Sequence, residues 1–291
     1  MLVKSALSEK YVNKLQMIFQ QKDWKMEKAG IASVFDRFCV RLSQLNNDDE
    51  RDLIIELTND YLWVQPDMYE EYLLKAFKQL FECSEWEVEE NKEIYICPLL
   101  PERDFGKIKS SGFMTYLCQS ILMRMFPEIT ENRINICNSP EDLEKDTDDI
   151  GALILVDDYI GSGQTALECL GYLNFLSDVG KKIFIISLVA QEDGIKNIRK
   201  ENVLVFAAQS RKRGISDKYP KAEAEEKLNM MRNISRQIEG PRNMMLGYGN
   251  SEGLVSMIKT PNNTFPVYWY ENKKYSSAPF VRGGSIKIVR S

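Results

Sequence analysis

Three short, almost wholly apolar runs restrict the possible folds of this chain more than any other feature of the sequence. They cover residues 152–156 (ALILV), 183–189 (IFIISLV) and 203–207 (VLVFA). Stretches with helical periodicity, residues 165–177 and 192–200, separate them. Strands that are apolar on both faces and alternate with helices are typical of a parallel sheet buried between helices. We therefore predict an α/β fold, with a parallel sheet flanked by helices.

The regions on either side of these runs differ in character. Up to about residue 90 the apolar residues recur at helical spacing, whereas the chain after Pro241 is rich in Gly, Asn and Pro. Further strands are expected at 94–98 and 133–137, with a charged, solvent-facing helix at 218–237. We expect a helical N-terminal region over residues 1–90. An α/β domain with a strand-and-turn extension would occupy 91–291.

Composition excludes several classes of function. The net charge of −5 argues against a protein that coats nucleic acid, which needs clustered Lys and Arg. The absence of histidine excludes Ser-His and Cys-His dyads and His-ligated zinc or haem. The six cysteines form no C-x-x-C pair, so we predict free, mostly buried thiols in a reducing cytoplasm. We expect no signal peptide in the opening MLVKSALSEKYVNK and no membrane span.

The stretch ALILV-DDYIGSGQT-ALECL, residues 152–170, carries the strongest chemical signal. Asp157 and Asp158 follow a strand, and the loop at 161–165 then opens a helix. Glycine N–H groups at a helix N-terminus form an anion site, to which Ser162 and Thr165 add hydroxyls. The two carboxylates can accept hydrogen bonds from vicinal sugar hydroxyls. A ribose 5-phosphate fits this order of groups, beyond the carboxyl end of a strand.

Other motifs with glycines fit less well. A Walker loop requires a Lys after the glycines, and a dinucleotide fingerprint places its glycines before the acid. Here no Lys follows, and the acids come first. A plain strand-to-helix turn with a capping aspartate remains the alternative.

The segment V-D-D-Y-I-G-S-G-Q-T, residues 156–165, resembles the phosphoribosyl diphosphate (PRPP) binding motif of type I phosphoribosyltransferases, and the similar core covers about 93–210. The resemblance implies that Asp157 and Asp158 hold the ribose hydroxyls. It also implies Mg²⁺ bound mainly through the ligand, with no metal site of the protein's own. The PRPP and phosphate-binding residues that it implies are Tyr159, Ile160, Gly161, Ser162, Gly163, Gln164 and Thr165.

One position departs from the family pattern. Purine-salvage members have an acid that contacts the purine where this chain has Gly161, which argues against 6-oxopurine salvage. The tail segments TPNNTFPVYWY and PFVR, with the KSSG loop, are similar to phosphoribosyltransferase-like proteins of bacterial conflict and antiphage systems, including retron-associated ones.

A second polar loop follows the first core strand, where the family binds pyrophosphate. Its candidate residues are Arg103, Lys107, Lys109, Ser110, Ser111 and Gly112. Taken alone, this loop is as well explained as a solvated basic segment. Beside the ribose-phosphate motif, we predict a pyrophosphate site, with catalytic roles for Asp157, Asp158, Lys107 and Lys109.

Two further sets of candidates are weaker. Arg211 and Arg213 follow a strand on the ligand side of the sheet and could meet pyrophosphate, a nucleotide or RNA, although a charge run is usually a solvated face. Residues 268–270 (YWY) could stack on a base or pack in the core, and Arg282 could reach an anion.

Three functions stay open. The first is an enzyme that binds PRPP or a nucleotide and makes or breaks the N-glycosidic bond at ribose C1, in the setting of antiphage defence. The second is a catalytically inactive module that senses PRPP or nucleotides. The third is an assembly protein whose N-terminal helices dock a reverse transcriptase, a retron ribonucleoprotein or a second copy of the chain. No membrane partner is expected.

Overall fold

The chain divides into two compact units. The computed structural model describes residues 7–26, 33–88, 92–125, 134–145, 149–178 and 182–282. One unit, the helical unit, comprises Met1–Val64 and Lys212–Ser291; the other, the sheet unit, comprises Gln65–Arg211. This division differs from the boundary predicted at residue 90.

The sheet unit is built on five parallel strands in the order β3-β2-β4-β5-β6. The predicted parallel α/β fold is confirmed. The strands are β2 (Glu93–Pro98), β3 (Ile134–Ile136), β4 (Ile150–Ile160), β5 (Lys182–Gln191) and β6 (Leu204–Arg211). The core of β4 is completely buried, with Ile154, Leu155 and Val156 at 0% exposure. Helices on both faces require such continuous apolar strands.

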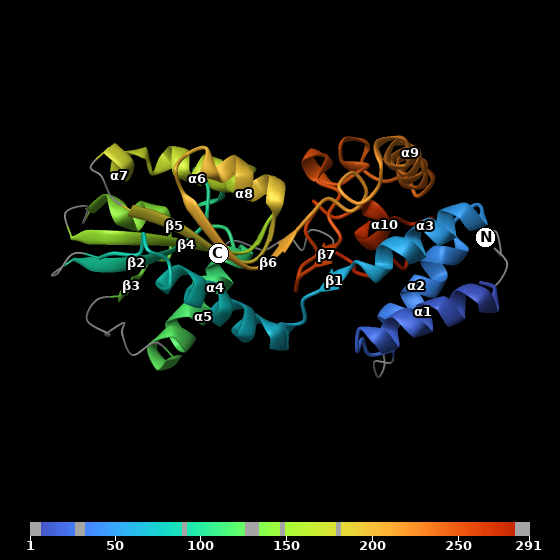
Figure 1. Ribbon diagram of the computed structural model, residues 1–291, viewed down its shortest axis with the longest axis horizontal. Coiled ribbons are helices and arrows are strands. Elements are labelled where there is room, and N and C mark those ends of the chain that lie inside the picture. The colour runs from blue at the N-terminus through green and yellow to red at the C-terminus, as the bar shows by residue number, and fades with distance from the viewer. Residues whose placement is uncertain are drawn as a thin grey trace. The chain divides into compact units, whose positions relative to one another are not determined.

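Helices cover the sheet on both faces (Figure 1). On one face lie α4 (Tyr69–Phe81) and α5 (Ser110–Met125); on the other lie α6 (Gln164–Tyr172), α7 (Asn174–Asp178) and α8 (Glu192–Arg199). Short 3-10 turns are η1 (Pro66–Met68), η2 (Glu102–Asp104) and η4 (Pro140–Lys145). The helix predicted at 165–177 is thus interrupted, at Leu173.

Two strands are longer than their apolar runs. β4 continues past Val156 to Ile160 because Asp157 keeps the ladder with Ser187 of β5 and the pairing resumes at Tyr159. Asp157 and Asp158 therefore stand on the strand, not in the loop after it. Likewise β6 extends beyond residue 207, so that Arg211 is its last residue. Backbone hydrogen bonds with neighbouring strands extend these strands into polar sequence. The pattern of apolar residues alone does not predict such an extension.

The helical unit combines the first helices with the C-terminal segment. Its elements are α1 (Glu9–Gln21), α2 (Val34–Ser43), α3 (Asp48–Asn59), α9 (Lys221–Gln237), η5 (Arg242–Met244), η6 (Tyr248–Asn250), α10 (Pro266–Trp269), and the parallel pair β1 (Leu62–Trp63) and β7 (Val255–Ser256). Capping side chains explain where α2 and α3 begin. Ser33 and Asp36 form a capping box before α2, and Asn47 accepts the Glu50 N–H at the start of α3.

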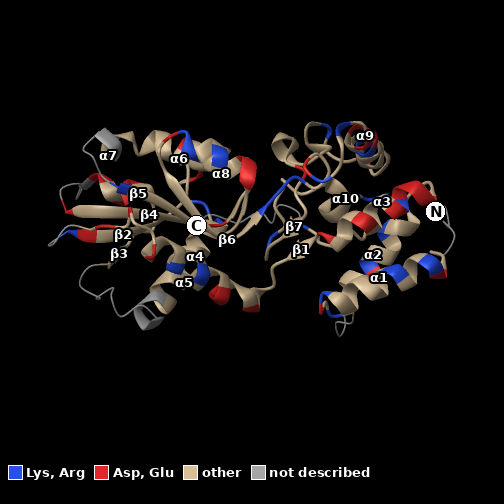
Figure 2. Cartoon of the chain, viewed as in Figure 1, with Lys and Arg blue, Asp and Glu red and all other residues tan. Residues whose placement is uncertain are grey.

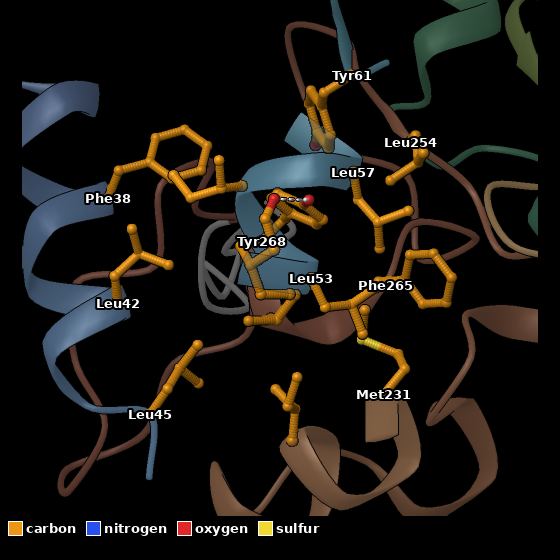
Figure 3. Close-up of a cluster of buried hydrophobic side chains, with 14 of the residues drawn as sticks. Phe38, Leu42, Leu45, Leu53, Leu57, Tyr61, Met231, Leu254, Phe265 and Tyr268 are labelled. Atoms are coloured by element: carbon orange, nitrogen blue, oxygen red, sulfur yellow. Dashed lines mark hydrogen bonds between the residues drawn. The ribbon is translucent and has the colours of Figure 1, made fainter. Parts of the chain in front are cut away.

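A single hydrophobic core joins the two ends of the chain within this unit (Figure 3). Phe38 and Leu57 from the N-terminal helices pack in the same cluster as Met231, Phe265 and Tyr268. This shared core explains why the C-terminal extension clusters with the N-terminal helices rather than with the sheet. Tyr268 is fully buried, so the core-packing reading of the aromatic tail is the one that the structure supports.

Helix α9 is not simply a solvent-facing helix, as its charge suggested. It buries a stripe that includes Ala224, Leu228, Met231 and Ile234. The charged residues of both signs along the same helix are seen in Figure 2. The high charge of the segment concealed this apolar face because the charged side chains of the helix, Lys, Arg and Glu together, outnumber its buried positions.

The prediction that the cysteines are free and mostly buried is confirmed. All six cysteines are free, and Cys97, Cys118, Cys137 and Cys169 are buried. Across the described ranges, the helices include none with the length and apolar character that crossing a bilayer requires. Residue 133, the first residue of the strand predicted at 133–137, lies outside the described residues.

Candidate active site

The two predicted acids lie at the carboxyl end of β4, the middle strand of the sheet. Each is held by a hydroxyl from a helix. Ser110 Oγ, at the start of α5, donates to Asp157 Oδ1 at 2.8 Å. The Tyr69 hydroxyl, at the start of α4, donates to Asp158 Oδ2 at 3.2 Å, and Asp158 is only 6% exposed. The acid pair is thus oriented before any ligand arrives.

The environment makes ionisation of this pair costly. Burial raises the pKa of both carboxyls, and the charge of Asp158 raises the pKa of Asp157 further. The hydrogen bond from Ser110 acts in the opposite direction on both groups. A half-buried carboxyl group beside a buried one destabilises the folded protein, which is typical of groups retained for binding or chemistry.

We expect Asp157→Asn to stabilise the protein. An acid whose pKa is raised by folding contributes stability below its unfolded pKa and loses it as the pH rises through the folded value. At pH 7 the raised pKa of Asp157 therefore lowers the free energy of unfolding, whereas an asparagine has no such cost and its side-chain oxygen can still accept from Ser110. Thermal unfolding at pH 7 should show a Tm higher by roughly 3 °C, the equivalent of about 1 kcal/mol.

The same comparison at about pH 3.5, near the unfolded pKa of aspartate, should show a much smaller difference, because the wild-type carboxyl is then largely protonated. A lower Tm for the variant at pH 7 would contradict the assignment of a raised pKa.

Three residues, Gly161 to Gly163, connect β4 to α6, and we call residues 161–165 the phosphate loop. Gln164 and Thr165 already belong to the first turn of α6 and are exposed. Gly163 is the N-cap residue with φ +84°, a conformation that favours glycine. A Cβ at Gly163 would also come within 2.9 Å of the Gly194 carbonyl oxygen, so the loop lies against α8.

Helix α8 contacts the backbone carbonyl groups of the phosphate loop. A Cβ at Gly194 would lie 2.1 Å from the Gly161 carbonyl oxygen, and Asn197 Nδ2 donates to the Ser162 carbonyl at 3.1 Å. Both carbonyls are thus turned toward α8. Because a trans peptide directs its N–H opposite to its C=O, the N–H groups of Ser162 and Gly163 point away from α8. Inward-turned carbonyls and outward N–H groups suit an anion site.

The second polar loop, residues 103–112, which we call the basic loop, has its charges paired within the sheet unit. Lys107 and Lys109 donate to the two carboxylate oxygens of Asp104, at 2.8 and 2.9 Å. Arg103 forms an ion pair with Glu168 of α6. Ser110 brings this loop to the acid pair through Asp157, so the predicted pyrophosphate loop and the predicted ribose acids do meet.

The remaining residues of the basic loop are less informative. Ser111 is buried at 1% exposure, and Gly112 lies in the first turn of α5 with open space around its Cα. Neither residue therefore offers a side chain to a ligand, and only the backbone at these positions could contact one.

Two residues of the predicted phosphate site, Tyr159 and Ile160, belong to strand β4 and not to the loop that follows it. The Ile160 side chain is 3% exposed in the core between the sheet and α6, so only its backbone can face a ligand. The Tyr159 hydroxyl is buried and has no hydrogen-bond partner among the described residues. Burial raises the pKa of Tyr159, and the charge of Arg211 opposes that rise.

The other arginines have partners in their own unit. Arg213 belongs to the helical unit and pairs with Asp217 at 2.7 Å. Arg282 Nη1 donates to the Thr260 carbonyl at 2.8 Å, and burial lowers the pKa of its guanidinium. The basic run from Arg211 to Arg213 is seen as a blue segment at the end of β6 in Figure 2.

Sequence reasoning missed Tyr69, Asp104, Glu168, Gly194 and Asn197. Asp104 stands among the lysines in ERDFGKIK, so its charge was a signal that could have been used. Tyr69 and Gly194 gave none, because their roles depend on which helices flank the end of β4.

Comparison with known proteins assigns the family. The family model PRTase-CE matches residues 40–280, which is most of the chain. The chain belongs to the PRTase-CE family. The match begins within α2 and ends at Phe280, so it covers the sheet unit and part of the helical unit.

Other comparisons are more distant. No curated protein matches. Among solved structures, orotate phosphoribosyltransferase from Aeropyrum pernix is 11% identical, with 46% of this chain and 68% of that one covered and a TM-score of 0.26. The AQ2163 protein from Aquifex aeolicus is 12% identical, with 72% and 88% covered and a TM-score of 0.31. The assignment to PRTase-CE rests on the family model, and this family suggests phosphoribosyl transfer or nucleotide binding.

Proposed function

We propose that the carboxyl end of β4 binds the ribose 5-phosphate part of PRPP or of a nucleotide. The observation that carries the proposal is the order of groups at this strand end. Asp157 and Asp158, already oriented by Ser110 and Tyr69, are followed directly by a loop whose N–H groups point away from α8. The carboxylates would accept the 2- and 3-hydroxyls, and the phosphate loop would take the 5-phosphate.

The chemistry at this site is the making or breaking of an N-glycosidic bond at C1. In the forward direction a base nitrogen forms a bond to C1 while the bond from C1 to the pyrophosphate oxygen breaks, and pyrophosphate leaves with the electron pair. Positive charge develops on the ribose ring and negative charge on the leaving group. Lys107 and Lys109 are placed in the loop that would stabilise that leaving charge.

Mg²⁺ is part of the proposal as an ion brought mainly by the ligand. Within the described ranges, no group of three Asp, Glu, Cys or His side chains is arranged to hold a metal ion. Two adjacent carboxylates, with phosphate oxygens from a ligand, match the oxygen donors that Mg²⁺ prefers. The residues that would share the ion are Asp157 and Asp158, and the ion would neutralise phosphate charge.

A catalytically inactive sensor is the second candidate. It is favoured by the ion pairs of the basic loop, in which Asp104 engages Lys107 and Lys109 and Glu168 engages Arg103. A variant with Lys107 and Lys109 replaced by alanine separates the two. Loss of turnover with retained ribose-phosphate binding supports the enzyme, whereas binding without turnover in wild type and variant alike supports the sensor.

The biological setting that we propose is bacterial antiphage defence in the cytoplasm. It is supported by the resemblance of the tail and of the KSSG loop, and the six free thiols suit a reducing compartment. The partner would be a retron-type reverse transcriptase with its RNA and DNA, or a second copy of the chain, bound through the N-terminal helices.

The test is calorimetric titration with PRPP, ribose 5-phosphate and nucleoside monophosphates in the presence of Mg²⁺. The double variant Asp157→Asn/Asp158→Asn should weaken ribose-phosphate binding at least about tenfold, because hydrogen bonds to two charged acceptors are lost. In cells that carry the gene with its neighbours, the same variant should lose phage protection.

The chain supplies a matched control. Asp48 and Asp49 are also adjacent aspartates, but they stand in the first turn of α3 in the helical unit. Asp48→Asn/Asp49→Asn should bind ribose phosphates like the wild type. Unchanged binding by the Asp157/Asp158 variant, or no binding of any of these ligands by the wild type, would contradict the proposed function.

A further inference from the structure

We propose that Asp104 is an internal anion that occupies the basic loop until a diphosphate displaces it, and that it thereby sets the affinity of this loop for diphosphates. The inference rests on the proposed function for the identity of the ligand. It goes beyond that function because it names Asp104 as a residue that opposes ligand binding, and the diphosphate as the ligand group with which Asp104 competes for the lysines.

The geometry shows that one carboxylate engages both lysines. Asp104 Oδ1 accepts from Lys107 Nζ at 2.8 Å, and Oδ2 accepts from Lys109 Nζ at 2.9 Å. The Asp104 side chain is 14% exposed, whereas the lysine side chains are 45% and 42% exposed. The acceptor is therefore sheltered and fixed, and the two ammonium groups lie at the surface, where an incoming anion can reach them.

Local backbone bonds hold this arrangement. The Asp104 N–H donates to the Pro101 carbonyl at 2.8 Å, and the Lys107 N–H donates to the Asp104 carbonyl at 3.1 Å. Lys107 Nζ also donates to the Arg103 carbonyl at 2.7 Å. The turn thus places the carboxylate between its lysines without help from distant segments, so a charge-neutral replacement at Asp104 leaves the turn intact.

Asp104 is ionised at neutral pH. Burial by itself raises the pKa of this carboxyl, but the hydrogen bonds and charges of Lys107 and Lys109 outweigh burial and lower the pKa below its ordinary value. A full negative charge therefore remains between the lysines across the physiological range.

Charge explains why a diphosphate is the competitor. Arg103, Lys107 and Lys109 face the two acids Asp104 and Glu168, so the set carries one net positive charge. Carboxylate and phosphate oxygens accept the same charge-assisted hydrogen bonds. A diphosphate presents oxygens to both ammonium groups at once and carries more charge than one carboxylate, whereas the phosphate of ribose 5-phosphate is expected in the phosphate loop.

The experiment is titration of the full chain with inorganic pyrophosphate and, separately, with ribose 5-phosphate. Asp104→Asn should tighten pyrophosphate binding about tenfold, since removing one unit charge beside two ammonium groups changes the interaction by about one factor of ten. Ribose 5-phosphate binding should stay unchanged. Asp104→Ser, which also lacks the charge, should show the same gain in pyrophosphate affinity. It provides an independent test if Asp104→Asn fails to fold.

Asp52 gives a matched control. It too lies between two lysines, with Lys14 at 2.6 Å and Lys10 at 3.5 Å, but in the helical unit. Asp52→Asn should not change pyrophosphate binding. Adding Lys107→Ala and Lys109→Ala to Asp104→Asn should remove the gain, because the gain uses those ammonium groups.

The outcomes separate this inference from the proposed function. Unchanged or weaker pyrophosphate binding in both Asp104 variants, or a gain that survives removal of the two lysines, overturns the role of Asp104 while ribose 5-phosphate binding stands. Absence of ribose 5-phosphate binding together with a pyrophosphate gain overturns the proposed ribose site and leaves the role of Asp104 supported.

Discussion

Replacing Tyr268 with alanine is expected to lower the free energy of unfolding of the helical unit by about 4 kcal/mol, the usual loss for a large buried aromatic side chain. Tyr268 is completely buried. Its ring lies 4.5 Å from that of Tyr61 and 6.1 Å from that of Phe38, measured between centroids. Figure 3 shows the side chain among residues from both ends of the chain. Alanine would leave a cavity where the two ends meet.

Two further variants sharpen this measurement. Tyr268→Phe keeps the ring and removes the hydroxyl, which lies 3.2 Å from Thr58 Oγ1; Thr58 still donates to the Ile54 carbonyl, so a loss of about 1 kcal/mol is expected. Tyr116→Ala, at a side chain 67% exposed, should change stability by less than about 0.5 kcal/mol. Urea denaturation measures all three. A loss below about 1 kcal/mol for Tyr268→Ala would show that the two ends do not share an essential core.

Replacing Gly194 with alanine is expected to weaken ribose-phosphate binding about a hundredfold, since a displacement of about 1 Å in a positioning element has effects of that size. The new Cβ would lie 2.1 Å from the Gly161 carbonyl oxygen, and side-chain carbons do not approach such atoms within 3.0 Å. The phosphate loop and α8 must therefore separate. Calorimetric titration with ribose 5-phosphate, beside thermal unfolding, measures the effect.

Gly171 supplies the control for this substitution. It too lies in a helix, near the end of α6, and a Cβ there would meet nothing within 4 Å. Gly171→Ala should leave binding unchanged and either leave stability unchanged or increase it by up to about 1 kcal/mol, because alanine favours helix. Wild-type affinity in Gly194→Ala would mean that the close approach of α8 does not position the loop.

Much of the sheet unit could be predicted from local sequence. The runs around Leu155 and Ile185 are apolar at successive positions because both faces of these strands are covered, and that pattern is visible without a structure. The acids and glycines of residues 157–163 could be placed at a strand end for the same reason. The extension of β4 through Asp157 could not, since it depends on pairing with β5.

The parallel sheet, its buried strands and the position of the acid pair before the phosphate loop could be predicted from residue patterns, because these features depend on neighbours along the chain. The folded structure was needed to show that Tyr69 and Ser110 orient the acids and that Gly194 and Asn197 hold the loop. It was also needed to show that the two ends of the chain share one core. Those contacts join residues far apart in sequence, some separated by more than 200 positions, such as Thr58 and Tyr268. Periodicity and composition carry no record of which distant side chains meet.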